Sequence, residues 1–168
     1  AVRLQIDPRR DRLVVEEGAV IERLTSIVGT CHVDLRRVNL EITETSYIKQ
    51  PAETMKVLYD LKGLGLQLWL DDFGTGHSSI THLQHFPLDG LKLPGDFIAG
   101  VPGDARCSSI TRALISLAHD LDMEVIAEGV EREDQLEFLL SHQCDSIQGF
   151  LFSKPMPLEE FESVLGER

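Results

Sequence analysis

The sequence alternates short apolar runs with longer amphipathic segments, and this alternation restricts the fold more than any other feature. The apolar runs are typical of buried strands and lie at residues 1–6, 38–42, 66–70, 90–93, 123–127 and 145–151. Between them, apolar residues recur at three- and four-residue steps, which predicts helices over residues 52–63, 78–86, 105–121 and 132–142. A last helix is expected to begin at Pro157, a residue favoured in a first turn. Strands that alternate with helices indicate βαβ units around a parallel sheet.

Two architectures fit six such strands: an open doubly wound sheet, or part of a (β/α) barrel. A complete barrel usually takes about eight strands and ~250 residues. The chain has 168 residues, so a barrel would require that some elements be missing. Either way, this length fits a single domain over residues 1–168 with a sizeable core.

Composition narrows the classes of function. The formal net charge of −12 weighs against a binding surface for DNA or RNA, which requires clustered Lys and Arg. The apolar runs fall short of the ~20 residues that span a bilayer, and the first residues lack the apolar core of a signal peptide. Cys31, Cys107 and Cys144 are far apart without a CxxC pattern, as expected of free thiols in a reducing cytosol. We therefore expect a cytoplasmic domain without membrane contact.

Ionisable and amide residues gather where the predicted strands end. In chain order they are Glu41 and Glu44, Asp71 and Asp72, Lys92, Glu128 and Glu131, and Gln148. In both architectures, chemistry takes place at the carboxyl ends of the strands. Five consecutive strands that each deliver such a residue to one edge predict a functional site there.

Each of these residues, taken alone, also has an ordinary structural explanation. Asp72 could form a turn, and Glu131 could lie in the first turn of a helix. Lys92 could extend its amine to solvent, and Gln148 could satisfy a backbone group. The histidines lack the spacing of a zinc site. Several acids with one lysine instead favour hard divalent cations such as Mg²⁺ or Mn²⁺. Adjacent aspartates at a strand end suit a two-metal site, and the expected chemistry is metal-assisted phosphodiester hydrolysis.

Five segments, "LEITE", "DDFGTGHSS", "LKL", "AEGVE" and "QGFLFSKPMP", resemble in order and spacing those of the EAL-domain family. The resemblance covers about residues 36–165. Members of this family are bacterial phosphodiesterases that open cyclic di-GMP to linear pGpG. The resemblance implies the family fold, a modified (β/α) barrel in which one strand runs antiparallel. Here that barrel is expected to be incomplete at its N-terminal side.

The resemblance also implies a role for each candidate residue. Glu41, Asp71 and Asp72 match metal ligands, with Asp71 in the bridging position. Lys92 matches the lysine that contacts the attacking water, and Glu128 matches the general base. Glu131 and Gln148 match supporting residues of the substrate pocket, and Glu44 matches the acid that anchors the loop after the DDFG motif. Residues 74–79 match that loop, which couples metal binding to activity and dimerisation.

Several positions depart from the family pattern. The Glu-Ala-Leu segment is absent, and Gln5 or Asp7 stands where a metal-binding asparagine is expected. Pro94 replaces an aspartate near the second metal, Asp96 follows two residues later, and His77 replaces a tyrosine.

These departures leave two hypotheses for function. The first is a Mg²⁺- or Mn²⁺-dependent cyclic di-GMP phosphodiesterase. The second is a degenerate, inactive module that binds cyclic di-GMP as a sensor, or binds only a protein partner. An open barrel would expose apolar edges, so we expect a homodimer or contact with a partner signalling domain.

Overall fold

The computed structural model describes residues 2–4, 35–43, 51–74, 80–157 and 159–161. Of the positions discussed above, Gln5, Asp7, Cys31, Glu44 and residues 75–79, His77 among them, lie outside these ranges. The expectations for these positions therefore stay predictions.

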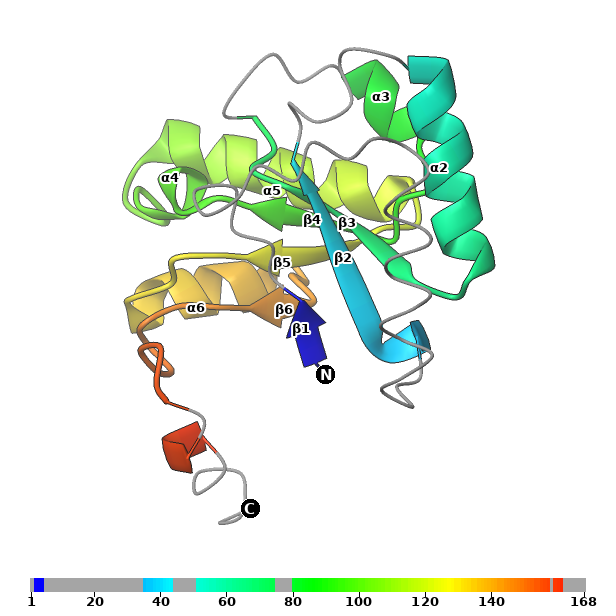
Figure 1. Ribbon diagram of the computed structural model, residues 1–168. Coiled ribbons are helices and arrows are strands. Elements are labelled where there is room, and N and C mark those ends of the chain that lie inside the picture. Colours follow the sequence, from blue (N-terminus) through cyan, green and yellow to red (C-terminus); the bar gives the residue numbers. More distant parts are fainter. Residues whose placement is uncertain (1, 5–34, 44–50, 75–79, 158, 162–168) are drawn as a thin grey trace.

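The described strands form one six-stranded sheet in which each strand pairs with the next along the chain (Figure 1). They are β1 (Val2–Leu4), β2 (Val38–Thr43), β3 (Gln67–Asp71), β4 (Gly90–Leu93), β5 (Glu124–Ala127) and β6 (Ser146–Ile147). All these pairings are parallel. A doubly wound sheet would reverse its strand order at a switch point, whereas this order never reverses. The arrangement is that of a (β/α) barrel wall, and the antiparallel strand of the family is not among the described strands.

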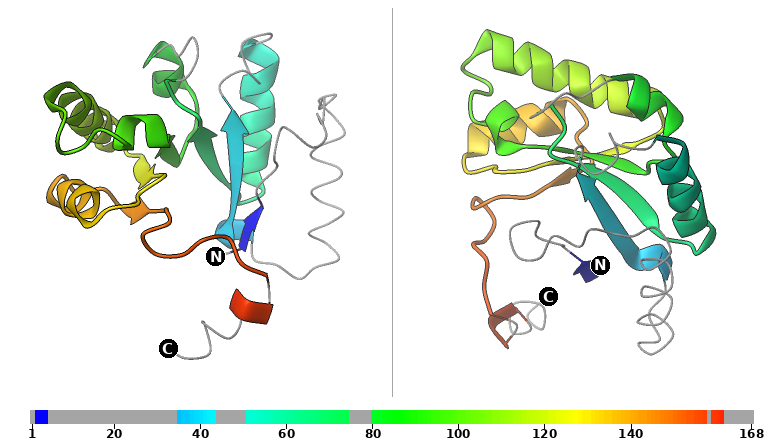
Figure 2. Two further views of the ribbon diagram at one scale, coloured as in Figure 1. Left: turned by 90° about the vertical axis from the view of Figure 1, so that its left-hand side faces the viewer. Right: turned by 45° about the horizontal axis from the view of Figure 1, so that its top comes forward.

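Helices surround the outside of the curved sheet (Figures 1 and 2). They are α2 (Pro51–Gly63), α3 (Ile80–His85), α4 (Gly95–Ile98), α5 (Ala105–Asp120) and α6 (Glu133–Ser141), and a 3-10 turn, η1 (Leu35–Arg37), precedes β2. The four helices predicted within residues 52–142 are confirmed with small shifts at their ends. Residues 159–161 are helical and the Phe161 N–H donates to the Pro157 carbonyl, as expected for a last helix that begins there. In the described part of the chain, no helix is long and apolar enough to cross a bilayer.

One strand prediction was too long. The run at 145–151 was expected to be a strand, but β6 ends at Ile147. The Gln148 N–H still bonds to the Ala127 carbonyl, and the chain then turns so that the Leu151 N–H reaches the Val130 carbonyl. Gly149 makes this turn possible, because a Cβ there would lie 2.0 Å from the Val130 carbonyl oxygen. The apolar residues after Ile147 therefore belong to a turn over the loop that follows β5.

Alternation along the strands separates two faces of the sheet. Leu68 and Leu70 of β3 and Leu91 and Leu93 of β4 are fully buried in the core beneath the helices. On the opposite face, the Trp69 ring covers Gly90, where a Cβ would lie 2.4 Å from the ring. Two residues further along each strand, this inner face presents polar side chains, which form the candidate site.

Two of the predicted free thiols, Cys107 and Cys144, lie in the described part of the chain, and both are free. Cys144 is buried, and burial raises the pKa of its thiol to about 11. The thiol is therefore protonated at neutral pH.

Candidate functional site

A buried lysine stands at the centre of the candidate site. Lys92 lies in β4, whose residues are all buried, and the lysine itself is only 1% exposed. Its Nζ atom lies 2.8 Å from Glu128 Oε1, 2.9 Å from Asp71 Oδ1 and 3.0 Å from Glu41 Oε2. The acids come from β2, the end of β3 and the residue after β5, so the parallel register brings them together. We call these four residues the lysine cluster.

The acids keep Lys92 charged. Burial lowers the pKa of Lys92, but hydrogen bonds to Glu128 and Asp71, the charge of Glu128 and a hydrogen bond to Glu41 outweigh it, and the pKa is raised. Lys92 is therefore an ammonium at neutral pH. Three carboxylates share this one cation, which leaves the cluster with two formal negative charges. That excess is what a divalent cation or a proton donor would offset.

The two adjacent aspartates have different environments. Asp71 closes β3 and its carboxylate belongs to the lysine cluster. Asp72 is exposed, and its φ of 56° places it in the left-handed region, where the chain leaves the strand. Its N–H donates to Asp71 Oδ1 at 3.1 Å. Asp72 is not among the described ion-pair partners of Lys92. Its role as a ligand of a second ion therefore stays a prediction.

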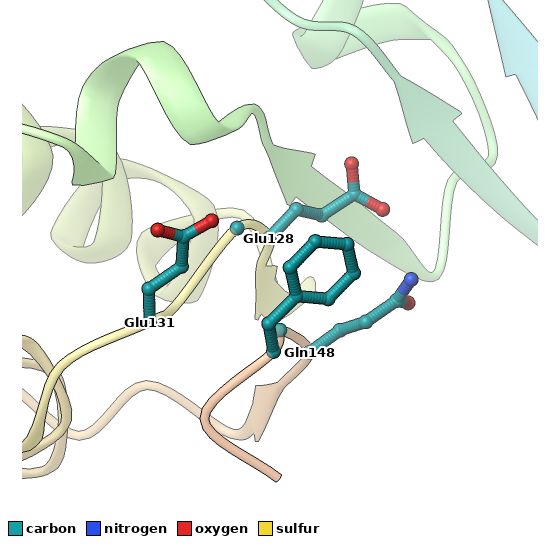
Figure 3. Close-up of a pocket in the computed structure, with 6 residues that line it drawn as sticks. Glu128, Glu131 and Gln148 are labelled. Carbon is teal, nitrogen blue, oxygen red and sulfur yellow. The ribbon is translucent and has the colours of Figure 1, made fainter. Parts of the chain in front are cut away.

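Glu128 connects the lysine cluster to an open pocket of about 220 Å³. The pocket is lined by Glu128, Gly129, Glu131, Gln148, Gly149 and Phe150. Figure 3 shows the Glu128 and Gln148 side chains extending toward the same side, with Glu131 at the other end of the pocket. The structure thus brings all three predicted residues of the AEGVE and QGF segments to one cavity.

The two segments that line the pocket are in close backbone contact. The Val130 N–H donates to the Gln148 carbonyl at 3.2 Å, and the Val130 carbonyl accepts from Leu151 N–H at 3.0 Å. Gly149 lies against Val130 too closely for any side chain. The positions of Glu128 and Gln148 are therefore coupled through the backbone.

The lysine cluster suits a divalent cation in the kind of donor and in charge, since carboxylate oxygens are the ligands that hard cations prefer. The number of ligands is a separate matter. Among the residues that the structure describes, no group of three His, Cys, Asp or Glu side chains surrounds a common point as metal ligands. The Lys92 ammonium stands between the three nearest acids instead. Glu44, Gln5 and Asp7 lie outside that part of the chain.

Sequence reasoning missed Gln135, a 2% exposed residue at the start of α6. Its side chain accepts from the Glu131 and Arg132 N–H groups and donates to the Ile98 carbonyl. A glutamine three residues into a helix is a recognisable capping-box position, so the sequence held a signal for its bond to Arg132. The bond to Ile98 spans 37 residues, and no local pattern predicts it.

Comparison with known proteins identifies the class of this fold and site. The family model for the EAL domain matches residues 1–155. The chain therefore belongs to the EAL-domain family.

A curated relative is "Cyclic di-GMP phosphodiesterase NbdA" of Pseudomonas aeruginosa, which is 42% identical over 128 residues, or 76% of this chain and 16% of that protein. The chain thus spans less than a fifth of that relative's length.

Solved structures are also similar. The EAL domain of Mycobacterium smegmatis DcpA superposes with a TM-score of 0.88 at 34% identity, covering 98% of this chain and 72% of that chain. A complex of Klebsiella pneumoniae BlrP1 with manganese and cyclic di-GMP has a TM-score of 0.76 at 30% identity, covering 82% of this chain and 35% of that chain. That related structure thus contains both manganese and cyclic di-GMP.

Proposed function

We propose that this chain, over residues 1–168, is a phosphodiesterase domain that hydrolyses cyclic di-GMP to linear pGpG with Mg²⁺ or Mn²⁺. The observation that carries the proposal is the lysine cluster, in which three carboxylates surround one buried ammonium beside an open pocket. Relatives named for this activity, and a related structure that contains manganese and cyclic di-GMP, support the same substrate.

In this proposal Glu41 and Asp71 would hold one cation, and Asp71 and Asp72 would hold a second. A divalent cation bound there would supply Lewis acidity at the phosphoryl oxygens and lower the pKa of the attacking water. Within the cluster three acids share one ammonium, and a divalent cation would add positive charge beside them.

The chain's own residues perform the proton transfer. Glu128 is the general base in this proposal, since it lies at the junction of the cluster and the pocket and its side chain is 23% exposed. The Lys92 ammonium lies 2.8 Å from the Glu128 carboxylate and holds it in place beside the pocket. Gln148 and Glu131 orient the phosphodiester and its nucleoside from the pocket wall.

The deciding experiment measures conversion of cyclic di-GMP to pGpG with Mn²⁺ and with Mg²⁺. The protein is compared with Asp71→Ala and with Asp120→Ala, a matched control that removes an exposed acid at the end of α5. We expect Asp71→Ala to lower turnover roughly 10²-fold or more, since a charged group at the reaction centre is lost. Asp120→Ala should stay within about twofold. Tight binding of cyclic di-GMP without turnover would overturn the proposal in favour of a nucleotide sensor.

The expected contact with a second copy or a partner signalling domain stays a prediction. Phe150 and Phe152, 56% and 59% exposed, are apolar surface near the pocket that such a contact would cover.

A further inference from the structure

One buried amide joins the segments that follow Lys92 and Glu128. Gln135 Oε1 accepts from Glu131 N–H at 2.9 Å and from Arg132 N–H at 3.1 Å. Its Nε2 donates to the Ile98 carbonyl at 2.9 Å. Ile98 ends α4, the short helix that begins directly after β4 and Pro94, and Glu131 lies in the loop that Glu128 begins. A single side chain therefore bridges the two segments that carry the closest ion pair of the lysine cluster.

Helix capping explains only part of this arrangement. A glutamine at this position normally returns a bond to the backbone of the residue that caps the helix, as Gln135 does to Arg132. Capping does not require the amide nitrogen to reach another helix, nor the side chain to be 2% exposed. The bond to Ile98 crosses 37 residues of sequence and serves the contact between α4 and the loop after β5.

These two segments are closely packed against each other. Gly129 has a φ of 69°, and a Cβ there would lie 3.1 Å from the Gly95 Cα atom. Arg132 adds a second link, since its Nη2 donates to the Val101 carbonyl at 2.6 Å. The Glu128 N–H in turn donates to the Leu93 carbonyl at 2.9 Å, next to Lys92. A displacement of the loop where it bonds to Gln135 is therefore expected to displace Glu128 as well.

We propose that Gln135 is a positioning residue, which holds Glu128 against Lys92 by tying the loop after β5 to the end of α4. Gln135 is not among the residues that line the pocket, so it acts through Glu128. Its effect on catalysis rests on the proposed function, whereas its effect on the position of Glu128 does not.

Gln135→Met tests this, because methionine keeps the length of the side chain and removes all three hydrogen bonds. The matched control is Thr111→Val, which removes another bond to α4, from Oγ1 of the buried Thr111 to the Phe97 carbonyl at 3.0 Å. We expect Gln135→Met to lower kcat about 10-fold or more and to change KM less than about threefold, since small displacements of a catalytic group are costly. Thr111→Val should keep kcat within about twofold.

Gln135→Glu keeps the side-chain oxygen that both N–H groups require but removes the donor to the Ile98 carbonyl, so we expect it to lower kcat as Gln135→Met does. If Gln135→Met and Thr111→Val have the same kcat at matched loss of thermal stability, Gln135 is only structural and the inference is overturned.

A structural readout decides the inference even if the parent protein shows no turnover, which would overturn only the proposed function. Hydrogen exchange at the Glu131 and Arg132 amides should be at least about tenfold faster in Gln135→Met than in Thr111→Val, because their acceptor is gone. A crystal structure of Gln135→Met should show the 2.8 Å contact between Glu128 and Lys92 broken or lengthened. An unchanged contact with unchanged exchange would overturn the inference.

Discussion

The two edges of the sheet carry the same kinds of charged side chain in different proportions. At the amino edge, Asp89 precedes β4 and Asp145 precedes β6, and each accepts the N–H of the second residue of the preceding strand. Each acid also pairs with a basic side chain from the last turn of a helix. Asp89 pairs with Lys62 of α2, the helix before β3, and Asp145 pairs with His119 of α5, the helix before β5. The same device thus occurs in two βαβ units, with one acid for each basic partner.

At the carboxyl edge, three acids share the single ammonium of Lys92. At the amino edge each acid has a basic side chain of its own as partner, and each acid also bonds to the backbone of the neighbouring strand. In the lysine cluster the acids outnumber the ammonium, so the cluster favours binding of a cationic ligand. In barrels of this class the active site lies at the carboxyl edge of the sheet, and residues at the opposite edge contribute to stability. The different ratio of acids to basic partners at the two edges gives a physical reason for this division.

Replacing Lys92 should have the largest effect. In Lys92→Met three carboxylates face each other in a buried site without their cation. We expect turnover of cyclic di-GMP to fall roughly 10³-fold or more, and the free energy of unfolding to fall by about 3–5 kcal/mol. Urea denaturation and initial rates measure the two effects. The matched control is Lys62→Met at the amino edge, which should keep the parent's turnover. Equal losses of activity in both variants would contradict the distinction between the edges.

Glu128→Gln should separate chemistry from stability at the carboxyl edge. The amide keeps the shape of the side chain but cannot take a proton, so we expect turnover to fall about 10²-fold or more. The midpoint of urea denaturation should change little, because the cluster still holds two acids against Lys92. A Glu128→Gln protein with the parent's rate would remove Glu128 from the role of base.

At the amino edge we expect a substitution to lower stability and to leave turnover nearly unchanged. Asp89→Ala removes the acceptor of the Leu68 N–H and the partner of Lys62. We expect a loss of about 1–3 kcal/mol in the free energy of unfolding, because the N–H of a buried strand residue is left unsatisfied. Turnover per folded molecule should stay within about twofold of the parent. A large loss of turnover with unchanged stability would mean that the amino edge takes part in chemistry.

The smallest effect is a dependence of stability on pH at Asp145. Burial raises the pKa of this carboxyl, but hydrogen bonds from His119 and from the Val125 N–H outweigh it, and the pKa lies below its ordinary value of 3.8. A depressed pKa stabilises the fold above the unfolded value, and this contribution is lost as the pH falls through the folded pKa. The stability difference between the parent and Asp145→Asn should therefore be full near about pH 6 and shrink below about pH 4. A difference that grows on acidification would contradict this assignment.

Local pattern was sufficient for most of the secondary structure. The helical periodicity of α5 and the apolar runs of β2 to β5 are visible within short stretches of the sequence. These elements could therefore be predicted to within a few residues. The four-residue helix α4 is too short for periodicity to reveal. The end of β6 depends on the contact between Gly149 and Val130, which belong to different segments, and for that reason the strand prediction continued too far.

The sequence by itself determined which side chains stand at the strand ends, because residue type and strand periodicity are local properties. The acids, Lys92 and Gln148 could be named on that basis. Only the tertiary structure decided that Lys92 collects Glu41, Asp71 and Glu128 within 3.0 Å. It also separated Asp71 from its neighbour Asp72, and it joined Gln135 to Ile98. These contacts depend on the register between strands and on packing between distant segments, and no run of adjacent residues encodes either of them.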